Sequence, residues 1–232
     1  MSASSTTRNQ IQNISSMQDL LSTPFHGDVN ALCWNRKLNG DFLEIVEKLE
    51  KDENITEVTI EDLSKLQLSN KGQLAREIIL SDWKTLTNHG ASPVLNIIKH
   101  YERDDVLPFI TTDVYSFHVD RSPIPTSTFL CTYHGEASEI VPNHQAVQKI
   151  MIPEIRQELK KLYSGNEESF EDFLTEHFFD LHYKTLPEAK IINLEKGNIW
   201  RLAVDHPESK VLPCIHRAPK EKNGESRLLL IC

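Results

Sequence analysis

The stretch of sequence that decides the fold runs from Phe109 to Tyr133 and reads FITTDVYSFHVDRSPIPTSTFLCTY. It is rich in Thr, Val, Ile, Phe and Tyr, the residue types that favour β-strands. The proline-bounded segment Arg121–Pro125 divides it, because proline cannot donate to a strand ladder. The stretch therefore predicts two strands, Phe109–Asp120 and Thr126–Tyr133, joined by a turn.

The sequence after Tyr133 returns first to a helical and then to a strand-like pattern. Apolar residues recur at helical spacing over Asn143–Tyr163, and Phe170–Phe179 predicts a second helix. Short β-rich segments follow from Ala189 onward. The predicted order is two strands, a helical insert between about 143 and 189, and then further strands. This order favours a β-sandwich or jelly roll wrapped by helices. The later strands are expected over Lys190–Leu194, Asn198–Val204, Val211–His216 and Arg227–Ile231.

The sequence before Phe109 is predicted to be mainly helical. Residues 1–24 are rich in Ser, Thr, Asn and Gln and predict a poorly ordered arm, with a short helical turn around Met17–Leu21. The predicted organisation is one α+β domain over 25–232, with a helical part at 25–108 and a barrel with its insert at 109–232. A strand is expected at Val29–Trp34, and helices at Asp41–Lys51, Thr59–Leu66, Lys71–Leu86 and Ser92–Glu102.

Composition narrows the class of protein. The 232 residues carry 34 Asp+Glu against 25 Lys+Arg, a net charge of −9, which argues against binding to nucleic acid. The longest fully apolar run is Leu228–Cys232, far short of the roughly 20 residues of a membrane span. The four cysteines lie far apart without a CxxC motif, which favours buried reduced thiols. With no targeting segment visible, we expect a cytoplasmic protein without membrane attachment.

The first candidate site is the sequence His118-Val119-Asp120 at the end of a predicted strand. Residues i and i+2 project from the same face of a strand, so the imidazole and the carboxylate point the same way. A histidine and a carboxylate are two of the three ligands of the facial triad that holds non-haem iron. The alternative is a buried histidine that pairs with a neighbouring carboxylate for structural reasons.

Two further candidates lie near the end of the sequence. His216 closes the apolar segment that begins at Val211, and Arg227 opens an otherwise apolar strand eleven residues later. A cation that leads such a strand needs an anionic partner, because an unpaired buried charge is costly. A dicarboxylate bound by the guanidinium group would be one such partner. An ion pair within the protein, or exposure at the start of the strand, is the alternative.

Together these residues resemble the superfamily of 2-oxoglutarate- and Fe(II)-dependent oxygenases over about residues 109–232. That superfamily has a cupin-like double-stranded β-helix, the jelly-roll fold. Its pattern has His-x-Asp on an early strand, a glycine turn, a distal histidine on a late strand, and Arg or Lys on the last strand. The matching positions are His118, Asp120, Gly197, His216 and Arg227.

The resemblance implies that His118, Asp120 and His216 bind Fe(II). It also implies that 2-oxoglutarate chelates the metal and that its far carboxylate reaches Arg227. Oxidative decarboxylation to succinate and CO2 would then be coupled to oxidation of a substrate C–H bond, most simply as a hydroxylation. Hydroxyl groups that could support the co-substrate are those of Thr128, Thr132 and Tyr133, depending on which face of the strand lies inside.

The sequence indicates the substrate only in outline: a small polar metabolite, an amino acid or a peptide. Helices of the insert and the loop Thr132–Pro142 are expected to cover the barrel mouth and to contact the substrate. The alternative is an insert that packs on the outer face of the sheet and only adds core. The side chains that this loop offers are Tyr133, His134, Glu136 and Glu139, a mixture that suits a small polar or cationic substrate.

Other polar residues are expected to have lesser roles. His134 and His144 lie either at the barrel mouth or on a loop, and Arg217 is a second candidate for the anion anchor. Trp200 is expected in the core. Surface positions are expected for His177, His182 and His206.

Two other functional classes remain open on the sequence. A cupin-like metal enzyme that does not use 2-oxoglutarate would keep the three metal ligands but would not need Arg227. A non-catalytic binding protein on a jelly-roll scaffold would not need the three ligands to converge. The segments Ala31–Arg36, Phe117–Asp120, Thr132–Glu136 and Cys214–Pro219 also resemble a family of bacterial proteins of unassigned function, over most of the chain, which adds no activity.

Overall fold

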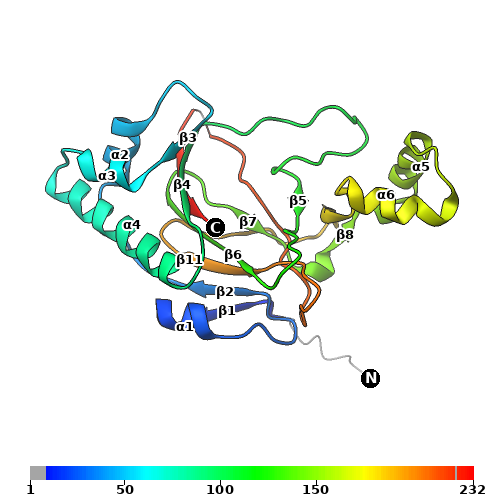
Figure 1. Cartoon of the computed structure of the whole chain (residues 1–232), viewed down its shortest axis with the longest axis horizontal. Helices are drawn as coiled ribbons and strands as arrows, with labels where there is room; N and C mark the ends of the chain where they lie inside the picture. The colour runs from blue at the N-terminus through cyan, green and yellow to red at the C-terminus, as the bar shows by residue number, and fades with distance from the viewer. Residues whose placement is uncertain (1–8, 223) are drawn as a thin grey trace.

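The computed structural model of the chain describes residues 9–222 and 224–232, and two β-sheets lie at its centre (Figure 1). The larger sheet contains β1 (Ile11–Ile14), β2 (Ala31–Trp34), β3 (Ile55–Val58), β4 (Val94–Ile98), β6 (Ser127–His134), β11 (Ile199–Ala203) and β13 (Arg227–Ile231). The smaller sheet contains β5 (Phe117–His118), β7 (Glu139–Ile140), β8 (Ala146–Gln148), β9 (His182–Thr185), β10 (Ile192–Asn193) and β12 (His216–Arg217).

Within these described residues, the strand order is β1-β2-β11-β6-β13-β4-β3 in the larger sheet and β10-β7-β12-β5-β9-β8 in the smaller sheet. Apart from the parallel pair β1–β2, neighbouring strands in both sheets are antiparallel. The helices are α1 (Met17–Ser22), α2 (Phe42–Leu49), α3 (Ile60–Lys65), α4 (Asn70–Asn88), α5 (Pro153–Leu162) and α6 (Phe170–Glu176).

Strand β6 shows how the two layers of core are built from alternating side chains. Phe129, Cys131 and Tyr133 belong to the cluster in which α1–α4 cover the outer face of the larger sheet. Leu130 belongs to a second cluster, which joins the larger sheet to Ile140 of β7 in the smaller sheet. Because side chains alternate along a strand, Thr128 and Thr132 share the inward face with Leu130.

The helices of the N-terminal half begin where their capping residues predict. Asp41 accepts a hydrogen bond from the amide of Glu44 at the start of α2, and Thr59 forms a capping box with Asp62 at the start of α3. Helix α4 ends before Gly90, whose φ of 96° lies in the left-handed region that glycine tolerates. The expected helices over Asp41–Lys51, Thr59–Leu66 and Lys71–Leu86 are therefore confirmed.

Two expectations for this half are wrong. Ser92–Glu102 contains the strand β4 rather than a helix, and β4 pairs with β3 on one side and β13 on the other. A serine followed by proline can open either element, and the β-branched residues of β4 satisfy their backbone groups in the sheet. The poorly ordered arm is contradicted over 9–24, because β1 adds to the edge of the sheet and Leu20 of α1 is fully buried. Residues 1–8 lie outside the described residues.

The insert is less helical than predicted. Helices form over α5 and α6, whereas residues 143–151 contain β8 between two short 3-10 turns. Strands β8 and β9 extend the smaller sheet beyond β5, so the insert supplies sheet as well as helix. Helices α5 and α6 lie at the opposite end of the molecule from α2–α4 (Figure 1) and pack in a cluster of their own with Ile110.

Several predicted strands are shorter in the structure. Phe109–Asp120 forms strand only at β5, and Val211–His216 contributes only His216 to β12. Lys190–Leu194 is reduced to β10, while the predictions for β6, β11 and β13 agree closely with the structure. Short strands at these positions still fix the register in which the candidate site residues face one another.

No helix in the described part of the chain is both long and apolar enough to cross a membrane.

The cysteines are expected to react slowly with thiol reagents in the folded protein. Cys33, Cys131 and Cys214 are buried free thiols, and burial raises the pKa of Cys33 and of Cys131 to about 12. Cys232 is half-buried, and burial raises its pKa to about 11. Titration with a chromogenic disulfide should therefore detect at most one thiol quickly in native protein and all four after denaturation. Rapid native reaction of two or more would contradict this packing.

A buried ion pair beneath α4 is expected to contribute strongly to stability. The Asp82 carboxylate accepts hydrogen bonds from both terminal nitrogens of Arg36 and, at 2.7 Å, from the hydroxyl of Tyr133. Asp82→Ala would leave the Arg36 guanidinium buried without its partner, so the free energy of unfolding should fall by about 3–5 kcal/mol. Urea denaturation measures this. The control Glu61→Ala removes an exposed ion pair with Lys65 and should have a much smaller effect.

Candidate metal centre

Two neighbouring strands of the smaller sheet bring the candidate metal ligands together. His118 on β5 is the direct cross-strand partner of His216 on β12, and His216 is also paired with Ile140 on β7. Directly opposed residues of antiparallel strands project from the same face. Because Ile140 belongs to the core between the sheets, both imidazoles project toward that interior.

The side chains of His118, Asp120 and His216 form a compact group. Each offers one ligand atom, and these atoms all lie within 4.8 Å of one another. The His216 Nε2 lies 3.6 Å from an Asp120 carboxylate oxygen, and the two imidazole centroids are 4.5 Å apart. Two imidazoles and one carboxylate on one side of a site are the donor set of a facial triad. His216 is buried, whereas 36% of the Asp120 side chain is exposed, so the group borders solvent.

Both histidines are oriented by the backbone of their own segments. The Nδ1 of His118 lies 2.8 Å from the carbonyl oxygen of Ser116, and the Nδ1 of His216 lies 3.2 Å from that of Cys214. A carbonyl can only accept, so each Nδ1 is assigned the proton. The Nε2 lone pair of each ring is then directed away from the backbone and free to bind a metal ion.

For His118 and Asp120, the electrostatic environment favours the protonation states that bind a divalent cation. Burial, with the neighbouring His216, lowers the pKa of His118 to about 4, so its imidazole is neutral at physiological pH. Burial opposes ionisation of Asp120, but His216, a hydrogen bond from Thr128 and His118 together lower the pKa of Asp120 below its usual value. The Thr128 hydroxyl on β6 thereby holds the carboxylate in place from the opposite sheet.

Arg227 is a second unusual group on the inner face of the larger sheet. Its side chain is nearly enclosed, since the residue is 5% exposed, and its Nη2 donates to the hydroxyls of Thr132 at 3.2 Å and Ser138 at 2.6 Å. Its Nε has no hydrogen-bond partner in the part of the chain that the structure describes. Among the described residues, no carboxylate forms an ion pair with this guanidinium. Burial lowers the pKa of Arg227, which reflects the cost of holding an unpaired charge there.

The strand β7 relates Arg227 to the metal ligands. Ser138, which binds the guanidinium, lies two residues before Ile140, and Ile140 is the cross-strand partner of His216. Two residues of extended chain span roughly 7 Å. The position that contacts Arg227 is therefore about that far from the position that is paired with His216. The three-ligand group and the buried cation therefore lie along one side of the same interior.

A family model described as "Protein of unknown function (DUF1826)" matches residues 109–232, which is more than half of the chain. The chain belongs to this family. His118, Asp120, His216 and Arg227 all lie within the matched part, whereas α1–α4 precede it. The expected resemblance to a family of unassigned function is thus confirmed over 109–232, and Ala31–Arg36 falls outside the match. No curated protein and no solved structure gives a match to the chain.

Tyr133 of this DUF1826 protein lies on the face of β6 that points away from the candidate metal ligands. Its side chain belongs to the outer face of the larger sheet and donates to Asp82, because odd-numbered residues of β6 face the helices. Thr132 has the inward parity and reaches Arg227, while Thr128 reaches Asp120. Of the three hydroxyls that the sequence left open, the structure therefore places two inside and one outside.

Among the other polar candidates of the family segment, Arg217, Glu136 and Glu139 form ion pairs. Arg217, the second candidate for an anion anchor, pairs with Glu139 at 2.7 Å. Glu136 lies 2.9 Å from the Lys222 ammonium. His134 lies 3.3 Å from Glu225. Trp200 is buried as expected, and its indole donates to the carbonyl of Leu194.

The sequence interpretation missed His182. It was expected on the surface, but it is the first residue of β9, is 7% exposed, and is the cross-strand partner of His118. Burial and the neighbouring His118 lower its pKa to about 3. The segment His182–Thr185 contains Tyr and Thr, a modest signal for a strand, but no sequence signal indicates its pairing with β5.

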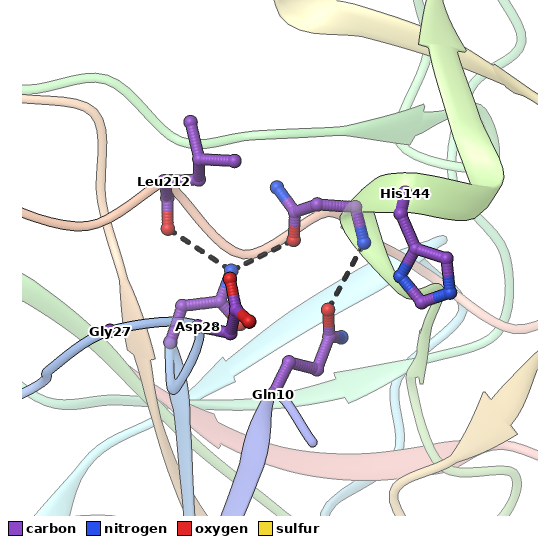
Figure 2. Close-up of a pocket in the computed structure, with 7 residues that line it drawn as sticks. Gln10, Gly27, Asp28, His144 and Leu212 are labelled. Atoms are coloured by element: carbon purple, nitrogen blue, oxygen red, sulfur yellow. Dashed lines mark hydrogen bonds between the residues drawn. The ribbon is translucent and has the colours of Figure 1, made fainter. Parts of the chain in front are cut away.

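A separate pocket of about 150 Å³ lies where the N-terminal segment meets the chain that leads to His216 (Figure 2). The Asn30 amide donates to the carbonyl of Leu212 at 3.0 Å and to the side chain of Asn143 at 2.8 Å. The Gln10 side-chain oxygen accepts from the backbone N–H of Asn143 at 3.1 Å. Exposed His144 lines this pocket from a short 3-10 turn, beside an amide network that connects distant segments.

Proposed function

We propose that this protein is an Fe(II)- and 2-oxoglutarate-dependent oxygenase that oxidises, most simply by hydroxylation, a C–H bond of a small polar metabolite, amino acid or peptide. The observation that carries the proposal is the convergence of His118, Asp120 and His216, with the unpaired Arg227 farther along the same interior. A binding protein on the same scaffold would have no need for either feature.

The strand order supports a double-stranded β-helix. The strands β11-β6-β13-β4 are adjacent in the larger sheet and β10-β7-β12-β5 in the smaller one. From β4 to β7, and again from β10 to β13, the chain alternates between the two sheets, as in an eight-stranded jelly roll. The insert that carries β8 and β9 falls between β7 and β10.

The donor chemistry fits Fe(II) and a chelating 2-oxo acid. His118 and His216 supply imidazole nitrogen, Asp120 supplies the carboxylate oxygen, and a facial arrangement of three protein ligands leaves positions for exogenous ligands. Arg227 has donors to spare and no acid partner among the described residues, so a carboxylate at the far end of a five-carbon dicarboxylate would complete its hydrogen bonding.

The chain's own groups position the reactants. Bound iron would supply the activation of dioxygen. Ser116 and Cys214 orient the imidazoles, Thr128 holds the Asp120 carboxylate, and Thr132 and Ser138 fix the guanidinium of Arg227. The apolar core between the sheets, which includes Leu130 and Leu229, keeps water from the interior.

The direct test loads the protein with Fe(II) without oxygen and adds 2-oxoglutarate. The chelated 2-oxo acid should give a visible charge-transfer band, and admission of oxygen should bleach it with formation of succinate. Pyruvate is the matched control, because it carries the same 2-oxo acid but lacks the carboxylate for Arg227. Metal binding without any response to 2-oxoglutarate would favour a cupin-like metal enzyme. Failure to bind metal would leave the non-catalytic binding protein.

A further inference from the structure

The smaller sheet places three histidines in one row. His216 on β12, His118 on β5 and His182 on β9 are consecutive cross-strand partners on adjacent antiparallel strands. Directly opposed side chains share a face, so all three imidazoles project toward the interior that holds the candidate metal site. The third comes from the insert, which brings β9 alongside β5.

His182 is close to the three-ligand group without being a member of it. Its ring centroid lies 5.8 Å from that of His118, compared with 4.5 Å between His118 and His216. The ligand atoms within 4.8 Å of one another belong to His118, Asp120 and His216 alone among the described residues. This spacing suits contact with a molecule bound at the metal better than contact with the metal itself.

The imidazole of His182 has unused hydrogen-bonding capacity. The residue is 7% exposed, yet its Nδ1 has no hydrogen-bond partner among residues 9–222 and 224–232. A buried polar atom without a partner is costly, and such atoms are frequently completed by a ligand. The charged groups that influence this ring are Lys149 and Asp104, but Lys149 donates to Thr111 and Ser116, and Asp104 accepts from Thr112.

We propose that His182 forms a hydrogen bond to the exogenous ligand on the β9 side of the metal. The inference rests on the metal centre of the proposed function and adds a recognition residue to it. The ligand it recognises is a small molecule with a polar atom next to the metal, such as a bound anion or a hydroxyl or carboxylate group of the substrate.

The test measures azide binding to the Co(II)-loaded protein through the change in its visible spectrum. His182→Phe removes the hydrogen bond while retaining a planar ring, and azide affinity should fall about 5- to 10-fold, as for the loss of one net hydrogen bond. His182→Gln retains a donor and should recover part of the affinity. Co(II) affinity itself should stay close to that of the parent in either variant, since the three ligands and the backbone hydrogen bonds that orient the two imidazoles remain. Exposed His100 provides the control His100→Phe.

Each other result overturns the inference in an identifiable way. Unchanged azide affinity in both His182 variants would show that the imidazole does not face the ligand. Loss of Co(II) affinity comparable to that of His118→Ala would make His182 a metal ligand instead. If the parent protein does not bind Co(II), the metal centre fails and the inference fails with it. If the parent binds the metal and azide but ignores 2-oxoglutarate, only the co-substrate assignment is lost.

Discussion

Alanine at position 216 should abolish stoichiometric Fe(II) or Mn(II) binding. His216 is buried, its Nε2 faces the Asp120 carboxylate at 3.6 Å, and its Nδ1 is already bound to the backbone. Removing it leaves only two ligands. Loss of a residue that merely supports a ligand costs roughly 10- to 100-fold in metal affinity, so loss of a ligand should cost more. Titration calorimetry with Mn(II) under anaerobic conditions measures the change.

Variants at the other candidate ligands, and at one exposed histidine, test whether the loss of metal binding is specific to this site. His118→Ala should behave as His216→Ala does, and Asp120→Ala should also weaken binding, because it removes the only anionic ligand. His100→Ala, at an exposed position, should bind as the parent does. Thermal denaturation of each apoprotein establishes that the fold survives. Parent-like Mn(II) affinity in both histidine variants would refute the assignment of this site.

Methionine at position 227 should weaken 2-oxoglutarate binding by roughly 30-fold or more, since truncating one partner of a buried charge-assisted pair costs about 2–5 kcal/mol. The same variant should not destabilise the apoprotein. The Arg227 guanidinium is buried with no acid paired to it in the described chain, and replacing an uncompensated charge by an apolar side chain of similar length should be neutral or stabilising. Thermal denaturation should therefore show a 2-oxoglutarate-dependent rise in Tm for the metal-loaded parent but not for Arg227→Met.

Two further variants separate an anion anchor from a structural cation. Arg227→Lys should recover only part of the affinity, because lysine lacks the planar fork that binds a carboxylate bidentately. Arg217→Met should retain the parent affinity, since that guanidinium pairs with Glu139. If Arg217→Met lost binding and Arg227→Met did not, the anchor would be Arg217. A destabilised Arg227→Met apoprotein would mean that the guanidinium has a structural role.

The sequence predicts the parts of this fold whose local signals agree with their tertiary surroundings. The strand β13 is predicted with its observed bounds, because a fully apolar run suits a strand buried on both faces. Helix α2 is predicted from its spacing and its Asp41 cap. The strand β4 is missed because Ser92-Pro93 imitates a helix start, whereas pairing with β3 and β13 determines the outcome.

The residues of the candidate site were likewise predictable from the sequence only in part. His118, Asp120 and His216 could be selected by residue type and spacing along the chain, and the structure brings them together. The contribution of Thr128 depends on which face of β6 is inside, and Tyr133 fell on the other face. The position of His182 depends on the pairing of β9 with β5, between residues more than sixty positions apart, and no local pattern encodes that pairing.

The position of β13 has a consequence for how the protein is made. It follows the other described strands of the larger sheet along the chain but lies in the middle of that sheet, between β6 and β4. Until residues 227–231 leave the ribosome, this sheet consists of two separate pieces, β1-β2-β11-β6 and β4-β3, each with an unpaired edge. Contacts of such long sequence separation form slowly. A nascent chain stalled before Arg227 should therefore be prone to aggregation. When β13 inserts between β6 and β4, it joins the two pieces of the sheet and also brings the Arg227 guanidinium into the interior.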